Sequence, residues 1–232
     1  MAGTPRQRAR EQTMAEIVRI GRKHLATDGA AALSLRAVAR DLGVVSSAVY
    51  RYVKSRDDLL TLLLIDGYDE LGDAVDAALA QVSEADHRAR LVALGHAVRT
   101  WALADPSTYA LLFGSPVPGY EAPAERTIEP GTRVVRALVE LLARAYADGA
   151  VAEQPAAVPL GDLTSDFAAI RDEFGVELPD EVLARGVLVW TSLFGAVSFE
   201  VFGQYGADTF SARGTLFDHH LAVLAEMVGL RS

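Results

Sequence analysis

Side chains that could contact a nucleic acid are concentrated between residues 34 and 56 of the 232-residue chain. Arginine and lysine neutralise phosphates, hydroxyl groups donate to phosphate oxygens, and arginine can read guanine through two hydrogen bonds. The residues that we assign to this chemistry are Arg36, Ser46, Ser47, Ala48, Tyr50, Arg51, Tyr52, Lys54 and Arg56. Arg51 is the long side chain best suited to guanine, and the set holds no Asn or Gln for adenine. The set therefore predicts binding to double-stranded DNA and leaves the recognised base sequence open.

A short helix is expected at the start of this region. Its apolar positions recur at i, i+3, i+4 and i+7, the spacing of one helix face, and they are Leu35, Val38, Ala39 and Leu42. Ser34 is placed to cap the first turn, and Gly43 stands where a left-handed residue would end the helix. We expect Val44 to turn into the core as the chain reverses.

A second helix over residues 46–52 is expected after this turn. It would bury Val49 and leave its N-terminal end facing outward, and this is the end that a helix-turn-helix motif points at bases. Val45 stands at the N-cap position, so Ser46 or Ser47 would have to supply the cap. Further on, Ser55 with Asp58 three residues later approximates a capping box for the next helix.

The stretch from residue 12 to residue 68 resembles the DNA-binding domain of the TetR family of bacterial transcriptional regulators. The positions in step with the family pattern, without a gap, are Ser34, Arg36, Val38, Ala39, Gly43, Val44, Val49, Tyr50, Tyr52, Ser55, Asp57 and Leu59. The departures are Val45 for a small polar residue, Val53 for Phe and Arg56 for Lys. The resemblance implies a transcriptional regulator, and a repressor in particular, that binds a palindromic operator as a homodimer.

Charge is distributed unevenly along the chain. Residues 1–56 carry 11 Lys and Arg against 4 Asp and Glu, whereas the other 176 residues carry 11 against 27, so the net formal charge of −9 hides a basic N-terminal part. A basic head supplies phosphate contacts, and an acidic body is repelled by the duplex. Alternatively, the basic arm over residues 1–11 is only a solvated tail, as blocks of like charge commonly are.

The rest of the chain has the periodicity of helices and no strand pattern. We expect an all-α fold of two domains: an N-terminal three-helix helix-turn-helix DNA-binding domain over residues 1–56, and a C-terminal helical bundle for ligand binding and dimerisation over residues 57–232. Outside the motif, helices are expected over residues 12–28, 55–79, 88–104, 106–113, 131–148 and 162–174, and in two C-terminal segments. Asp105 and Pro106 should begin one of them, residues 114–123 read as a loop, and a linker with Pro155 and Pro159 follows residue 149.

The two C-terminal segments, one after Pro179 and one over residues 209–228, are apolar on most of their surface. Helices of this kind need cover on most sides, so we predict that they meet the same helices of a second copy in a four-helix interface. The residues assigned to this dimer interface are Leu183, Val187, Val197, Val201, Phe217, Leu221 and Leu224. The alternative is that both segments are ordinary core helices of a monomer. In the resembled family, the two C-terminal helices do dimerise.

The C-terminal part resembles, more loosely, the WHG-type ligand-binding domain of actinobacterial members of the family, through residues 99–114 and 190–195. Phe194 replaces the histidine of that form, which argues for a more apolar cavity. The candidates for lining an effector pocket are Trp101, Tyr109, Phe113, Tyr120, Phe167, Trp190 and Phe194. Each of them could instead be plain core, because aromatic residues at helical spacing commonly are. The resemblance implies a small-molecule effector that acts by shifting the populations of two states.

Composition argues against several other classes of protein. The chain has no cysteine, which excludes disulfides, thiolate metal sites and cysteine nucleophiles. The most apolar stretch, residues 186–199, is shorter than a bilayer span, and the N-terminus lacks the apolar run of a signal peptide. We therefore expect a cytoplasmic protein that contacts no membrane.

Catalysis and metal binding find little support in the residue pattern. His219 and His220 lie beside Asp218, but adjacent histidines point to different sides of a helix, and no phosphate loop or nucleophile motif is present. We predict no catalytic residue, no metal ligand and no cofactor, with an enzyme as the weak alternative. A more serious rival is an architectural protein that binds duplex DNA without sequence preference and without an effector.

Overall fold

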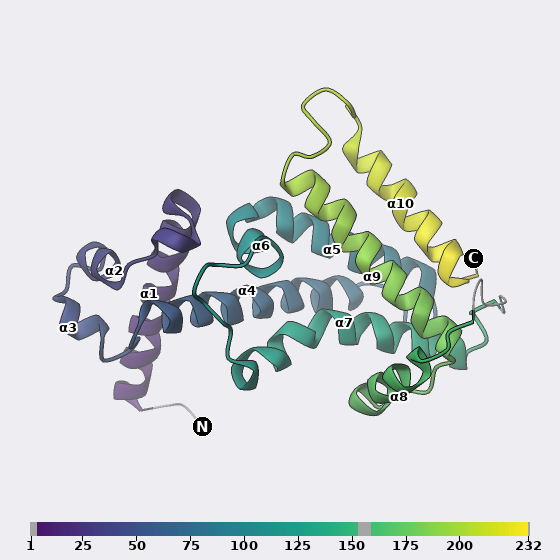
Figure 1. The fold of residues 1–232 in the computed structure, drawn as a ribbon, viewed down its shortest axis with the longest axis horizontal. Helices are drawn as coiled ribbons and strands as arrows, with labels where there is room; N and C mark the ends of the chain where they lie inside the picture. The colour runs from purple at the N-terminus through teal and green to yellow at the C-terminus, as the bar shows by residue number, and fades with distance from the viewer. Residues whose placement is uncertain (1–3, 153–158, 232) are drawn as a thin grey trace. The chain divides into compact units, whose positions relative to one another are not determined.

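The computed structural model describes residues 4–152 and 159–231, and over these residues the chain is helical (Figure 1). Its elements are α1 (Pro5–Asp28), the 3₁₀ turn η1 (Ala30–Ala32), α2 (Leu35–Asp41), α3 (Ser46–Val49), α4 (Arg56–Leu79), α5 (His87–Ala104), α6 (Pro106–Phe113), α7 (Ala124–Ala147), α8 (Leu163–Phe174), α9 (Asp180–Val201) and α10 (Arg213–Val228). An isolated antiparallel bridge joins Val151 to Leu230. The all-α fold is thus confirmed, and Pro155 of the expected linker lies outside the described residues.

The chain divides into two compact units, which are described separately. Unit 1 holds Met1–Glu70 and Ala104–Gly131, and unit 2 holds Leu71–Leu103 and Thr132–Ser232. The boundary expected after residue 56 falls at the first turn of α4, a helix that continues without interruption to Leu79. The division into a DNA-binding and an effector-binding domain at this position stays a prediction.

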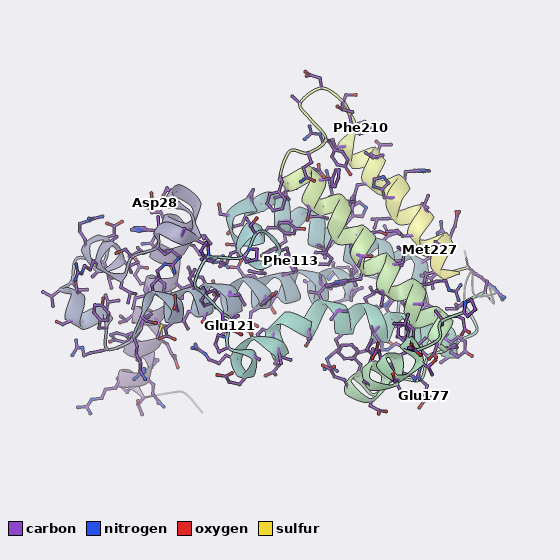
Figure 2. All side chains as sticks on the ribbon, in the orientation of Figure 1. Asp28, Phe113, Glu121, Glu177, Phe210 and Met227 are labelled. Atoms are coloured by element: carbon purple, nitrogen blue, oxygen red, sulfur yellow. The ribbon has the colours of Figure 1, made fainter. Side chains whose placement is uncertain are left out.

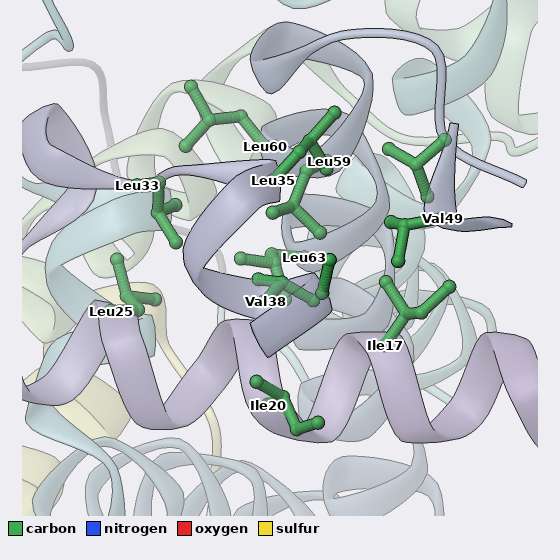
Figure 3. Packing of buried hydrophobic residues seen from close by; sticks show 12 residues of the cluster. Ile17, Ile20, Leu25, Leu33, Leu35, Val38, Val49, Leu59, Leu60 and Leu63 are labelled. Atoms are coloured by element: carbon green, nitrogen blue, oxygen red, sulfur yellow. The ribbon is translucent and has the colours of Figure 1, made fainter. Parts of the chain in front are cut away.

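Unit 1 is built around one apolar core (Figure 3). Side chains from α1, η1, α2, α3 and α4 form the part that we call the head, and its buried residues are Ile17, Ile20, Leu25, Leu33, Leu35, Val38, Ala39, Val49, Val53, Leu59, Leu60 and Leu63. A Cβ atom at Gly21 would lie 3.1 Å from the Leu63 side chain, so the glycine allows α1 and α4 to approach closely. The apolar face predicted for α2 is confirmed, since Leu35, Val38 and Ala39 are buried.

The first helix begins at Pro5, well before the start expected at residue 12. Thr4 caps it: the Gln7 N–H donates to the Thr4 hydroxyl over 3.3 Å, and the Thr4 N–H donates to the Gln7 side-chain oxygen over 2.7 Å. This reciprocal pair is a capping box, and Pro5 suits the first helical position. Residues 5–10 of the basic arm therefore form the first turns of α1, and their side chains are solvent-exposed, as the tail alternative expected.

The turn between α2 and α3 follows the prediction in part. Gly43 has a φ of +73°, the left-handed conformation expected there. Val44 is 40% exposed, so the expectation that it enters the core is wrong. After the left-handed turn at Gly43, Val44 lies at the surface, and the next apolar residue to enter the core is Val49 of α3. Ser34 stands at the N-cap of α2 but makes no side-chain capping bond there.

The remainder of unit 1 is α6, the loop after it and the first turns of α7. Asp105 caps α6 as expected, accepting from the Thr108 N–H over 3.0 Å and from the Thr108 hydroxyl over 2.7 Å. A Cβ atom at Gly67 would lie 2.6 Å from the Thr108 methyl group, so α4 and α6 pack closely. α7 begins at Ala124 and not near residue 131, because Pro130 removes one backbone hydrogen bond without ending the helix.

Unit 2 is a bundle in which α9 packs against α10 and α8. Its largest buried side chains are Leu71, Leu91, Leu94, Leu138, Leu142, Leu193 and Leu221. Arg99 of α5 donates two hydrogen bonds of 2.7 Å to Glu200 at the end of α9. The last helix begins at Arg213 and not at residue 209. By length and composition α9 could cross a membrane, but a core helix passes the same test, and Leu193 of α9 is buried within the protein.

Candidate nucleic-acid interface

The recognition segment, residues 46–54, is held on two apolar anchors. Val49 and Val53 are buried in the head core. Around these anchors the exposed assigned side chains are Ser47, Tyr50, Arg51 and Lys54, whereas Ser46, Ala48 and Tyr52 are partly buried. Arg36 is exposed on the neighbouring α2. The motif thus presents a cluster of hydroxyl, phenol and cationic groups on a rigid apolar base.

The recognition helix itself is shorter than expected. It ends at Val49, and residues 50–52 continue in turns instead of completing the helix predicted over residues 46–52. Val45 occupies its N-cap position, and no side chain makes a capping hydrogen bond there. From the sequence, either Ser46 or Ser47 is expected to supply the cap, and neither of them does.

Arg56 turns inward, although the sequence assigns it to phosphate contact. Its Nη2 donates to the carbonyl oxygen of Ala30 over 3.0 Å and to that of Ala31 over 3.3 Å. Its Nη1 lies 3.4 Å from the Asp57 carboxylate. The guanidinium group is thus hydrogen-bonded to the backbone of η1. In this geometry Arg56 links the start of α4 to η1 and acts as a brace that stabilises the head.

Tyr52 combines two environments. Its ring packs against the head core, and the Arg10 guanidinium lies over that ring at 5.9 Å from its centroid. A cation over an aromatic face is attracted by the ring quadrupole. The contact brings the N-terminal part of α1, with its arginines, beside the recognition segment.

A buried histidine joins α1 to α2. The Nε2 atom of His24 lies 2.8 Å from Oδ2 of Asp41, and the His24 side chain is almost fully buried. The hydrogen bond from His24 holds the pKa of the Asp41 carboxyl below its ordinary value. The pair fixes the end of α2, the helix that precedes the turn into α3.

Asp58 organises the start of α4, directly after the recognition segment. Its Oδ2 accepts from the Lys54 N–H over 3.1 Å, and its own N–H donates to the Ser55 hydroxyl over 3.0 Å. Its Oδ1 accepts from Arg126 of α7 over 2.8 Å. Burial raises the pKa of Asp58, but the hydrogen bonds from Arg126 and Lys54 outweigh burial and leave it below its ordinary value. The capping box expected for Ser55 and Asp58 is confirmed in its Ser55 half, whereas the Asp58 carboxylate accepts from the Lys54 N–H and not from that of Ser55. The contact with Arg126 is one that the sequence did not predict.

Comparison with known proteins assigns this geometry to a family. Residues 13–63 match the model of the bacterial regulatory proteins of the tetR family, and residues 91–224 match that of the tetracyclin repressor-like C-terminal domain. The chain belongs to the TetR family. It is 49% identical over 225 residues to HTH-type transcriptional regulators of Mycobacterium bovis and Mycobacterium tuberculosis, covering 95% of this chain and 96% of each relative.

Two solved structures have a similar fold. The regulatory protein SCO4313 is 33% identical, with a TM-score of 0.77, over 96% of this chain and 100% of that one. A tetR-family bacterial regulatory protein from Rhodococcus RHA1 is 16% identical, with a TM-score of 0.61, over 94% and 98% of the two chains, and this likeness concerns the fold alone. The TetR family consists of DNA-binding transcriptional regulators and not of enzymes. This confirms the prediction of a transcriptional regulator and the prediction that the protein is not an enzyme. The narrower WHG-type likeness stays a prediction.

The aromatic residues assigned to an effector pocket divide between the two units. Tyr109, Phe113 and Tyr120 belong to unit 1, and Figure 2 labels Phe113 at the end of α6. The rings of Tyr109 and Phe113 are 5.1 Å apart. In unit 2 the rings of Trp190 and Phe194 are 4.2 Å apart. The other two residues of the set, Trp101 and Phe167, also lie in unit 2. Each unit thus brings together part of the set, and the pocket itself stays a prediction.

Tyr120 and Phe167 already have structural roles. Tyr120 packs against the head core and its hydroxyl lies 3.0 Å from Oγ1 of Thr61. Phe167 is buried beneath α8. Both contacts are those of core residues, the alternative that the sequence left open for each aromatic residue.

Four residues assigned to the dimer interface are buried inside the protomer. They are Leu183, Val197, Phe217 and Leu221, and another copy cannot reach them in this structure. Val187 is exposed, and Val201 and Leu224 are partly buried. The helices are apolar on two faces, so periodicity selected the face that packs against the protomer's own core.

The exposed apolar face of α9 and α10 carries a shallow groove. It has a volume of about 590 Å³ and is lined by Ser192, Gly195, Ala196, Phe199, Tyr205, His219, His220, Val223 and Leu224. Phe199 and Val223 are about half exposed. The ring of Tyr205 lies 5.5 Å from that of Phe199 and 5.5 Å from that of Phe210, which Figure 2 labels in the loop before α10. Of the assigned interface residues, Leu224 lines this groove.

Within residues 4–152 and 159–231, no group of three or more His, Asp or Glu side chains is arranged to hold a metal ion. His219 and His220 lie along the groove. His96 pairs with Asp218 at 3.1 Å, and His87 pairs with Asp148 at 2.9 Å. In the described part of the chain, these histidines therefore contact single carboxylates or line an apolar surface.

Proposed function

We propose that this TetR-family regulator binds a palindromic operator as a homodimer in the cytoplasm and represses transcription until a small, fairly apolar molecule binds its body. The observation that carries the proposal is the exposed cluster of Ser47, Tyr50, Arg51 and Lys54 on the buried anchors Val49 and Val53. Such a surface offers phosphate contacts from several side chains and one arginine for guanine. Repression is chosen over activation because of the family resemblance.

The apolar groove on α9 and α10 supports a second copy as the partner. A two-fold dimer uses the same patch on both chains, and a groove of small and apolar residues beside the half-exposed Phe199 and Val223 can receive its own copy. The dimer interface that we propose therefore contains Val187 and Leu224 from the original set, together with Phe199 and Val223. Two heads in such a dimer would read half-sites about one helical turn apart, or about 34–36 Å.

The aromatic pairs of Tyr109 with Phe113 and Trp190 with Phe194 support an apolar effector. The chain has two tryptophans, Trp101 and Trp190, and both belong to the proposed lining. Their fluorescence therefore reports directly on binding when the protein is titrated with a panel of small apolar acids and ketones. Trp101→Phe and Trp190→Phe variants then assign the signal.

The decisive experiment is selection of duplexes from a random pool by the full-length protein at moderate salt. We expect enrichment of a palindrome with half-sites about one helical turn apart. Salt-sensitive retention of all sequences without enrichment would instead support the architectural, sequence-independent binder.

A further inference from the structure

A preformed loop joins α6 to α7 within unit 1. We call residues 114–126 the strap. The Tyr120 N–H donates to the Val117 carbonyl oxygen over 3.1 Å, and Gly119 has a φ of +74°. Pro118 and Gly119 thus occupy the central positions that a type II turn favours. Because prolines restrict the strap before it folds, it loses little conformational entropy when it packs.

The strap makes its first contact with the head core. Val117 and Tyr120 pack against that core. The hydroxyl of Thr61, a residue that is only 2% exposed, donates to the Asp57 carbonyl oxygen over 2.9 Å. Since this uses the single Thr61 proton, the Tyr120 hydroxyl donates to Thr61 across their 3.0 Å separation. The strap is therefore hydrogen-bonded to the first turns of α4.

The strap makes its second contact at the junction between the recognition segment and α4. Arg126 donates to one oxygen of Asp58 over 2.8 Å, and the other oxygen accepts from the Lys54 N–H over 3.1 Å. Lys54 is the last residue of the recognition segment. A single carboxylate therefore links the strap to the backbone that carries the DNA-contacting side chains. The Arg126 side chain is 39% exposed, so this ion pair contributes little to overall stability and acts mainly on geometry.

We propose that the strap sets operator affinity by positioning the recognition segment, with Tyr120 and Arg126 acting through Thr61 and Asp58. The inference rests on the proposed function, since it requires that the protein discriminates an operator. It deepens that function by naming two residues outside the recognition segment that set its position. Tyr120 and Arg126 are positioning residues and contact no base.

The experiment compares four full-length proteins: wild type, Arg126→Gln, Tyr120→Phe and the control Arg133→Gln. Arg133 also joins α7 to α4, through Asp73 and Asp76, but several turns away from the recognition segment. Affinity is measured for the duplex selected from a random pool and for a random duplex of the same length. Amide hydrogen exchange is measured over residues 46–58. Arg126→Lys is included because it keeps the positive charge if Arg126→Gln folds poorly.

We expect Arg126→Gln to weaken binding to the selected duplex about tenfold and to the random duplex less than about twofold, because loss of a charged hydrogen bond loosens the register of the segment and leaves its phosphate contacts in place. Exchange over residues 50–58 should become faster. Tyr120→Phe should show the same pattern more weakly, and Arg126→Lys should lie between wild type and Arg126→Gln.

The inference is overturned if Arg126→Gln matches Arg133→Gln in both affinity ratio and exchange. It is also overturned if Arg126→Gln lowers both affinities equally, since that is the effect of a merely structural role. If the wild-type protein shows no preference for any duplex, the proposed function fails. The exchange measurement then still decides whether the strap holds the segment.

Discussion

Arg56 donates from Nη2 to the carbonyl oxygen of Ala30 over 3.0 Å, which turns an arginine expected at the DNA surface into the head. The contact joins the first residue of α4 to η1, the turn that connects α1 with α2. Backbone carbonyl oxygens at such a turn need donor partners, and a guanidinium group supplies several donors in a fixed plane. The head is thus held together by a polar brace as well as by its apolar core.

Replacing Arg56 should destabilise the head. Arg56→Gln is expected to lower the free energy of unfolding by about 1–2 kcal/mol, because two carbonyls lose a charged donor. The exposed neighbour provides the control, since Lys54→Gln should stay within about 0.5 kcal/mol of wild type. Urea unfolding followed by circular dichroism measures both. Equal stability of the two variants would show that Arg56 is not a brace.

Arg51 and Lys54 should affect DNA binding in different ways. Arg51→Ala is expected to reduce the preference for the selected duplex by about 1–3 kcal/mol, as a lost bidentate contact to guanine does. Lys54→Ala and Tyr50→Ala should weaken binding to all duplexes, and Lys54→Ala should lower the salt dependence by about one phosphate contact. Affinity titrations at several salt concentrations separate these effects. An equal loss on selected and random duplex for Arg51→Ala would contradict its assignment to bases.

A side chain at Gly43 should lower stability through its backbone conformation alone, because nothing lies within 4 Å of a Cβ atom there. The φ of +73° at Gly43 costs an L-residue about 1–2 kcal/mol, so Gly43→Ala should lower the free energy of unfolding by that amount. Gly214→Ala is the control, because Gly214 lies in α10 with nothing within 4 Å of a Cβ atom. That variant should be neutral or slightly more stable, since alanine favours helices. Thermal unfolding of both variants tests the difference.

The stability that Asp58 contributes should disappear in acid. Its folded-state pKa lies below its ordinary value, so the contribution is complete above the ordinary pKa and is lost as the pH falls through the lowered one. We expect the excess stability of wild type over Asp58→Asn to be constant above about pH 5 and to shrink below about pH 4. Urea unfolding across this range gives the difference. An excess that grew toward low pH would contradict the lowered pKa.

The groove on α9 and α10 should control the oligomeric state. Val223→Glu places a charge on the half-exposed apolar surface and should shift the protein from dimer to monomer without unfolding it, because burying an unpaired charge is costly. Thr215→Glu, which is exposed on α10 outside the groove, should leave the state unchanged. Sedimentation measures the mass of each variant. If the Val223→Glu protein remained dimeric at low micromolar concentration, the groove would not be part of the dimer interface.

Much of the head could be predicted from short-range patterns. The spacing of Leu35, Val38 and Ala39 gave the buried face of α2, and Gly43 marked a left-handed turn, because both features depend on residues within one or two helical turns. The start of α1 was missed although Thr4 and Gln7 have the spacing of a capping box. The helix was expected to begin at residue 12, close to its apolar periodicity, and the basic arm before it was left open as a possible tail.

Contacts between distant residues could not be predicted. Asp58 and Arg126 are 68 positions apart, and nothing in either neighbourhood indicates the other. Four residues of the expected dimer surface proved to be buried in the protomer, and the reason for this is different. Since α9 is apolar on two faces, periodicity finds Leu183 and Val197 as readily as Val187, and only the packed structure shows which face the protomer covers itself.

The measurement that most directly tests a dimeric, sequence-specific regulator is the affinity of the full-length protein for its selected palindrome before and after insertion of five base pairs between the half-sites. Half a turn, about five base pairs, places the half-sites on opposite faces of the duplex. We predict that affinity falls to within about tenfold of that for random DNA, since one head then loses its base contacts. Unchanged affinity for the lengthened site would contradict the account, because it would mean that the two heads do not read the operator together.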